Sequence, residues 1–125
     1  MRKSKINISG FKIGTAENRE GLTGVTVILA PDGGATAGVD VRGCAPGTRE
    51  TDLLDPRKTV QKIHAVVLSG GSAFGLEAAS GCVKYLAEQG VGFPIGNVCV
   101  PIVCSAVLFD LMIGDEKAYP DLLMG

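Results

Sequence analysis

Residues 63–90 read IHAVVLSGGSAFGLEAASGCVKYLAEQG, and this stretch decides the fold class. Its apolar start predicts a buried strand over residues 63–68, and a glycine-rich turn follows at residues 69–71. A helix is then expected from Ser72, its N-cap, to about Gln89, and Gly90 ends it. One face of this helix is apolar, with Phe74, Ala78, Val83 and Leu86. The order strand, turn, helix indicates α/β structure.

The neighbouring segments predict further strands. Residues 11–16 read as a first short strand. Residues 25–30 and 35–41 flank a Pro-Asp-Gly-Gly turn, which predicts a β-hairpin. Thr59 to Lys62 is expected to form a helical turn. The apolar run over residues 98–113 predicts one or two strands, with no helix in the sequence to cover them.

Composition limits the classes of function. The chain has 125 residues, which fits one small domain or part of one, and 46% are hydrophobic. Its formal net charge of −1 gives no electrostatic footprint for nucleic acid or an anionic membrane. Residues 98–113 are interrupted by polar residues and are too short to span a bilayer. The basic start, residues 1–5, is not followed by an apolar run, so no secretory signal is expected.

The four cysteines do not predict a metal site. Cys44, Cys82, Cys99 and Cys104 form no Cys-x-x-Cys pair, and His64 is the only histidine of the chain. We interpret the cysteines as reduced thiols that act as small hydrophobic side chains in a cytoplasmic protein. His64, at the start of a buried-type strand, is interpreted as a core or edge side chain. No metal and no cofactor are expected.

Residues 39–54, VDVRGCAPGTRETDLL, form a loop with an unusual concentration of charge. Four charged side chains lie close together in it: Arg42, Arg49, Glu50 and Asp52. Carboxylate–guanidinium pairs among them would make the loop rigid. We interpret the loop as part of the architecture rather than of the chemistry.

The turn at residues 69–75, SGGSAFG, has three possible interpretations. A nucleophile elbow would use Ser72, but Phe74 stands where the last glycine of Gly-x-Ser-x-Gly belongs. A phosphate-binding loop would need the Walker lysine or the dinucleotide fingerprint, and both are missing. The favoured interpretation is close packing of the helix on the sheet, with backbone N–H groups available to a carbonyl or carboxylate ligand.

Taken together, the motifs resemble peptidase family S58, the P1 or DmpA-like peptidases. The resemblance runs from about Phe11 to Gly125, and it is carried by residues 38–52, 66–76, 100–103 and 106–111. The family includes L-aminopeptidase/D-esterases, β-peptidyl aminopeptidases and nylon-oligomer hydrolases. The resemblance implies an αββα sandwich of the kind shared with ornithine acetyltransferase. It also implies self-cleavage into α and β subunits, which frees a Ser or Thr nucleophile at the N-terminus of β.

The resemblance also implies that important parts lie outside this sequence. Family members are much longer, and the nucleophile, an oxyanion-hole Asn and its acidic and lysine partners belong to segments beyond Gly125. Residues 1–125 are therefore expected to be a single partial domain, the N-terminal portion of an autoprocessing hydrolase, inactive alone and without a catalytic residue of its own. Its expected partners are the remaining β-subunit segment or a second copy. The whole enzyme would act on small peptides, amides or esters.

Six residues are candidates for the wall of the substrate site: Gly70, Gly71, Ser72, Val107, Phe109 and Asp110. Aminopeptidase members carry a Glu that holds the substrate ammonium and a Tyr that stabilises the oxyanion where this chain has Val107 and Phe109. Neither side chain performs those tasks, so Phe109 is also read as a buried strand aromatic. Two alternatives stay open: a non-catalytic remnant or domain that binds a small acidic ligand, and an acyltransferase of the ornithine acetyltransferase type.

Overall fold

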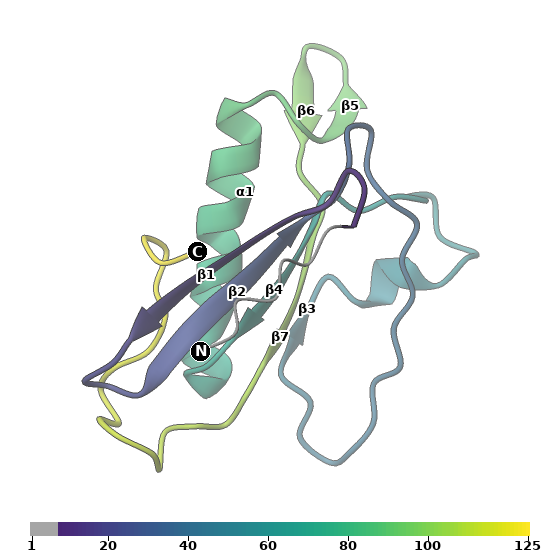
Figure 1. The fold of residues 1–125 in the computed structure, drawn as a ribbon. Helices are drawn as coiled ribbons and strands as arrows, with labels where there is room; N and C mark the ends of the chain where they lie inside the picture. Colours follow the sequence, from purple (N-terminus) through teal and green to yellow (C-terminus); the bar gives the residue numbers. More distant parts are fainter. Residues whose placement is uncertain (1–7) are drawn as a thin grey trace.

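The computed structural model describes residues 8–125 as an α/β structure (Figure 1). A five-stranded sheet has the order β1-β2-β4-β7-β3, with β1 Lys12–Asn18, β2 Thr23–Leu29, β4 Ala65–Ser69, β7 Val103–Val107 and β3 Thr48–Arg49. A separate two-stranded hairpin consists of β5 Phe93–Ile95 and β6 Val98–Val100. The helices are α1 Ala78–Glu88 and two 3₁₀ helices, η1 Asp52–Leu54 and η2 Ser72–Glu77. Among residues 8–125, no helix has the length and apolar character that crossing a bilayer requires.

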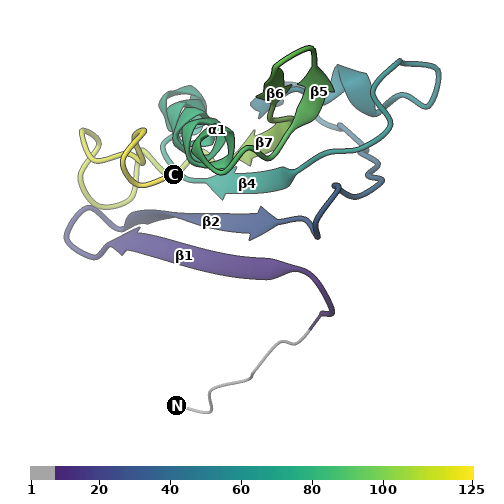
Figure 2. The same cartoon turned by 90° about the horizontal axis from the view of Figure 1, so that it is seen from above.

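The centre of the fold is the unit β4–α1–β7, which confirms the predicted α/β class. β4 and β7 pair in parallel, with Val67 opposite Ser105. Parallel strands need a crossover between them, and the chain makes it through η2, α1 and the β5–β6 hairpin. Figure 2 shows α1 end-on beside β4 and β7, on one side of the sheet.

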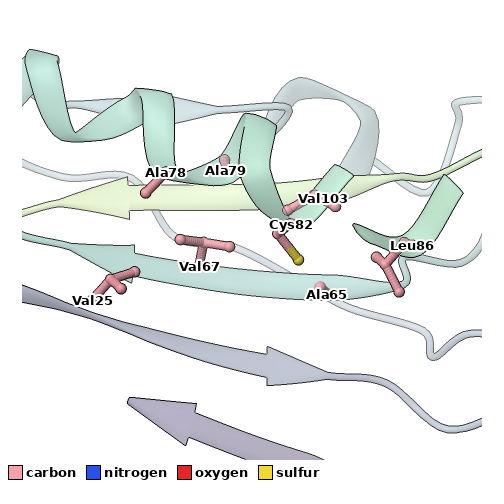
Figure 3. Packing of buried hydrophobic residues seen from close by; sticks show 8 residues of the cluster. All are labelled: Val25, Ala65, Val67, Ala78, Ala79, Cys82, Leu86 and Val103. Carbon is pink, nitrogen blue, oxygen red and sulfur yellow. The ribbon is translucent and has the colours of Figure 1, made fainter. Parts of the chain in front are cut away.

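The hydrophobic core lies between α1 and this part of the sheet. Figure 3 shows eight buried residues of the cluster: Val25, Ala65, Val67, Ala78, Ala79, Cys82, Leu86 and Val103. The small side chains on α1 let the helix approach the strands closely. Burial raises the pKa of the Cys82 thiol to about 11, and that of Cys104 to about 11. These two cysteines are therefore protonated hydrophobic side chains at neutral pH, as the sequence indicated.

The predicted hairpin of residues 25–30 and 35–41 is wrong. β2 pairs with β1 on one edge and with β4 on the other, so neither edge is open to residues 35–41. The turn after β2 has Gly33 and Gly34 at positive φ, and it sends the chain away from β2 to a single bridge between Ala35 and Ile63. The true hairpin is β1–β2, which includes the first strand that the sequence predicted.

The helix begins later than predicted. Ser72 is not a helix N-cap: Gly71 (φ 80°) and Ser72 (φ 53°) are both left-handed, and this reversal turns the chain from β4 towards the helix side. The 3₁₀ helix η2 takes six residues, Ser72–Glu77, before α1 starts at Ala78. Phe74 therefore leaves the apolar face and stacks its exposed ring on Tyr119, with 4.9 Å between centroids. The predicted end of the helix at Gly90 is confirmed, because Gly90 has the left-handed conformation of a helix-ending glycine, with a φ of 69°.

Two smaller predictions are also corrected. Residues 59–62 form no helical turn, and the short helix of this region is η1 instead. Residues 98–113 do contain two strands, β6 and β7, but the expectation that no helix covers them is wrong for β7, because α1 packs on it. The opposite face of the sheet is more exposed to solvent. On that face Leu68 is 46% exposed, and Ile13 is also exposed.

His64 provides a prediction on the pH dependence of folding. Burial lowers the pKa of His64, and the Ile102 N–H donates to Nδ1 at 3.1 Å, which requires that nitrogen to be unprotonated. A histidine whose pKa falls on folding binds its proton more readily in the unfolded chain, so the free energy of unfolding decreases as the pH falls below about 6.5. We expect urea unfolding to show this decrease between pH 7 and 5.5. His64→Asn keeps an acceptor for Ile102 and should remove most of the decrease; an unchanged slope in the variant would contradict the prediction.

Candidate functional site

The strand-to-helix turn is tied to the segment that follows β7. The Leu108 N–H donates to the Ser69 carbonyl at 2.8 Å, and the Ser72 N–H donates to the Leu108 carbonyl at 2.9 Å. These bonds continue the parallel pairing of β4 and β7 past the ends of both strands. The turn and the loop after β7 therefore form one rigid unit.

Asp110 completes this unit by joining the turn to β2 through its two carboxylate oxygens. Oδ1 accepts from the Gly71 N–H at 2.6 Å, and Oδ2 accepts from the Thr23 hydroxyl at 2.8 Å. The favoured interpretation of the turn expected N–H groups that could hold a carboxylate. The Gly71 N–H does bind a carboxylate, but this carboxylate is the side chain of Asp110 and not a ligand. The structure thus brings together the candidates Gly71 and Asp110.

The same geometry is inconsistent with a nucleophile elbow at Ser72. His64, the only histidine of the chain, lies just before β4, whereas Ser72 follows the other end of that strand. A Ser–His pair needs the two side chains within hydrogen-bond reach. Ser72 therefore has no histidine to act as its base.

A pocket of about 880 Å³ lies at this end of the sheet. Of the six candidate wall residues, Gly70, Val107 and Asp110 line it, and Gly71, Ser72 and Phe109 do not. Ends of β1 and β2 also contribute, including Asn18 and Thr23. The sequence did not point to these two residues, because Thr23 meets Asp110 across 87 positions of the chain.

Phe109 is not the buried strand aromatic that the sequence suggested. β7 ends at Val107, and the backbone of Leu108 then turns to bond with the β4 turn. Phe109 follows in an irregular segment with 70% of its surface exposed. Val107, at the strand end, is half-buried.

The charged loop is not held by the ion pairs that we predicted. Arg42 pairs with Asp40 at 2.6 Å, and Arg49 Nη1 donates to the Ser80 hydroxyl at 2.7 Å. Within residues 8–125, neither arginine pairs with Glu50 or Asp52. The reason is β3: its pairing with β7 places Arg49 opposite Ser105, from where its side chain reaches α1.

Arg49 and Arg42 allow a matched test of whether the Arg49–Ser80 hydrogen bond stabilises the fold. Arg49→Leu removes the hydrogen bond that joins β3 to α1 and should lower the free energy of unfolding by about 1 kcal/mol. Arg42→Leu removes only an exposed ion pair, and we expect no measurable change. Urea denaturation of both variants checks this. Equal effects would show that the Arg49–Ser80 bond adds nothing to stability.

No metal centre is found in the part of the chain that the structure describes: no three His, Cys, Asp or Glu side chains there gather as a metal site would require. The wall of the pocket includes the end of the rigid turn, the bound Asp110 and apolar side chains.

Comparison with known proteins decides the family. The model of peptidase family S58 matches residues 5–119, which is most of the chain. The protein belongs to peptidase family S58. An uncharacterized aminopeptidase of Mycobacterium leprae is 51% identical over 102 residues, which is 82% of this chain and 28% of the relative. An uncharacterized aminopeptidase of Mycobacterium tuberculosis is 52% identical over 97 residues, which is 78% of this chain and 28% of the relative.

A second group of S58 relatives carries a different name. The 6-aminohexanoate-oligomer endohydrolase of a Kocuria strain is 35% identical over 121 residues, or 97% of this chain. The match covers 31% of that relative. The S58 chain described here thus spans about a third or less of the length of these relatives.

Proposed function

We propose that this S58 chain is the N-terminal portion of an amide hydrolase that cleaves itself into two subunits and then uses a freed Ser or Thr as nucleophile. The nucleophile and its partners would come from segments that the relatives have beyond the matched region. Support comes from the match to the family over residues 5–119 and from the short share of each relative that the chain covers. Residues 1–125 would then form one partial domain.

The role that the geometry supports for this portion is to build one wall of the substrate site. The observation that carries this role is the pocket beside the Asp110-bound turn. Residues 69–72 and the segment after β7 are fixed to each other by hydrogen bonds, so their position needs no ligand. A rigid wall of this kind positions a substrate for a nucleophile brought by another segment.

The open face of the sheet supports the partner part of the proposal. α1 covers one side of β4 and β7, while Leu68 and Ile13 on the opposite face are exposed. An exposed apolar sheet face is stabilised by another layer. In an αββα sandwich this layer is a second sheet, which the remaining segments would supply.

Of the alternatives, binding of a small acidic ligand at the turn is less favoured, because the Asp110 carboxylate already occupies the Gly71 N–H. The acyltransferase alternative has no specific support, since the relatives are named aminopeptidases and oligomer endohydrolases. Hydrolysis of amides in peptides or related oligomers therefore remains the proposed reaction.

The decisive experiment is to express the gene together with its downstream reading frame. We expect the longer protein to appear as two fragments by mass spectrometry and to hydrolyse amino-acid amides or aminohexanoate oligomers, while residues 1–125 alone do not. An unrelated downstream sequence would overturn the proposal. So would hydrolysis by residues 1–125 alone that is lost on Ser72→Ala.

The isolated chain is also expected to associate with itself or to be only marginally folded, since its open sheet face has no second layer. Analytical ultracentrifugation should show species larger than a monomer, or calorimetry should show a broad, weak transition. Leu68→Lys places a charge on this face and should reduce the association. A monodisperse wild-type monomer with a sharp cooperative melt would contradict this expectation.

A further inference from the structure

The outer edge of β1 lies at one side of the five-stranded sheet. β1 is the first strand in the order β1-β2-β4-β7-β3, and within residues 8–125 no strand pairs with its far side (Figure 2). We infer that this edge is an interface at which a second copy of the chain adds its own β1, antiparallel, across a two-fold axis. The inference concerns β1 alone and does not depend on the proposed hydrolase function.

β1 lacks the features that usually protect the edge of a sheet. It is seven residues long, contains no proline, and pairs with β2 through seven consecutive residue pairs without a bulge. Its charged side chains, Lys12 and Glu17, lie near its two ends, so residues 13–16 between them are uncharged. Residues 12–17 are all exposed. A long edge strand of this kind offers its outward N–H and C=O groups to another strand.

The opposite edge of the same sheet is protected. β3 has only two residues, Thr48 and Arg49, and it ends at Glu50, whose φ of 59° is left-handed. A left-handed residue does not continue an extended strand. Another strand can therefore add to the five-stranded sheet at β1 but not at β3, and pairing between two copies gives a closed dimer rather than a growing sheet.

The sequence of β1 fits pairing with itself, which favours a second copy as the occupant. A two-fold axis beside Thr15 overlaps all seven residues of the two strands and places Lys12 opposite Asn18 of the second copy. No like charges then face each other, and the two Thr15 side chains form a cross-strand pair of a favourable type. Lys12 also lies next to the second copy's β1–β2 turn, which carries the oppositely charged Glu20.

Single cysteines test the interface and its register in residues 1–125. A Cys44→Ser, Cys99→Ser background leaves only buried native thiols. In this background, Thr15→Cys should form a disulfide-linked dimer under mild oxidation at least about tenfold faster than Ile13→Cys or Glu17→Cys alone, because only position 15 faces itself. An equimolar mixture of Ile13→Cys and Glu17→Cys should give the linked heterodimer, since these two positions face each other in the same register.

Charge variants measure the association by analytical ultracentrifugation. Leu68→Lys suppresses contacts through the open sheet face, so this background reports association at β1, and we expect it to be a dimer. Adding Thr15→Lys should give a monomer, because two lysines then oppose each other. Adding Thr59→Lys, which introduces the same charge at an exposed position outside β1, should leave the dimer intact.

Three results would overturn the inference: a monomeric Leu68→Lys background, a dimer that persists in Thr15→Lys, or equal cross-linking rates at positions 13, 15 and 17. The outcome is separate from that of the proposed function. Absence of hydrolysis in the longer protein would overturn the proposed function and leave the β1 interface unchanged.

Discussion

Gly75→Ala is expected to lower the free energy of unfolding by about 3 kcal/mol, the upper part of the range for overpacking a buried position. Gly75 is buried in η2, directly under the turn after β4. A methyl group there would overlap the Gly70 carbonyl and lie 2.7 Å from the Ser69 hydroxyl. Both neighbours belong to the rigid turn, which has hydrogen bonds to Leu108 and Asp110 and cannot move aside freely.

Urea denaturation, followed by circular dichroism, measures this effect. Gly14→Ala is the matched control, because a methyl group at Gly14 meets no atom within 4 Å and an edge strand tolerates alanine. Adding Ser69→Ala to Gly75→Ala should not restore stability, since the Gly70 carbonyl still blocks the methyl group. Recovery in this double variant would place the conflict at the serine hydroxyl and contradict the expected cause.

Asp110→Ala is the second variant with a large expected effect, a loss of about 3 kcal/mol. It removes two hydrogen bonds to a carboxylate and leaves the Gly71 N–H without its acceptor. Bonds to a charged group contribute more than neutral ones, and an unpaired buried donor adds a further cost. Asp110→Asn keeps an acceptor of the same shape and should lose only about 1 kcal/mol.

A double-mutant cycle with Thr23→Val divides the effect between the two partners. Thr23→Val alone removes one bond and should cost about 1 kcal/mol, and it should cost much less in the Asp110→Ala background. Amide hydrogen exchange at Gly71 should become faster in Asp110→Ala and remain slow in Thr23→Val. If Asp110→Ala costs no more than Thr23→Val, the bond to Gly71 does not stabilise the turn.

Much of the fold follows from local sequence signals. The apolar stretch before Ser69, the glycines after it and the small residues of 78–90 predict a strand, a turn and a helix, and β4 and α1 confirm this order. The prediction that the helix ends at Gly90 is confirmed. This end depends only on the left-handed backbone conformation of Gly90 itself, which a glycine adopts readily. The thiols of Cys82 and Cys104 are buried as their apolar surroundings indicated.

The errors arise where a local signal competes with strand pairing. The Pro-Asp-Gly-Gly turn at residues 31–34 predicted a hairpin, but both edges of β2 are occupied by β1 and β4. The charges of the loop predicted internal ion pairs, but the pairing of β3 with β7 directs Arg49 to α1. The apolar character of Phe109 predicted burial, but the strand ends two residues earlier.

The sequence by itself determined the family, the α/β class and the glycine-rich turn, because each depends on residues that are close together in the chain. Only the tertiary structure decided what the turn binds. Asp110 lies 39 positions from Gly71 and 87 from Thr23, and it binds both because β2, β4 and β7 are neighbours in the sheet. A contact of that kind depends on strand order and register, which no local pattern of residues specifies.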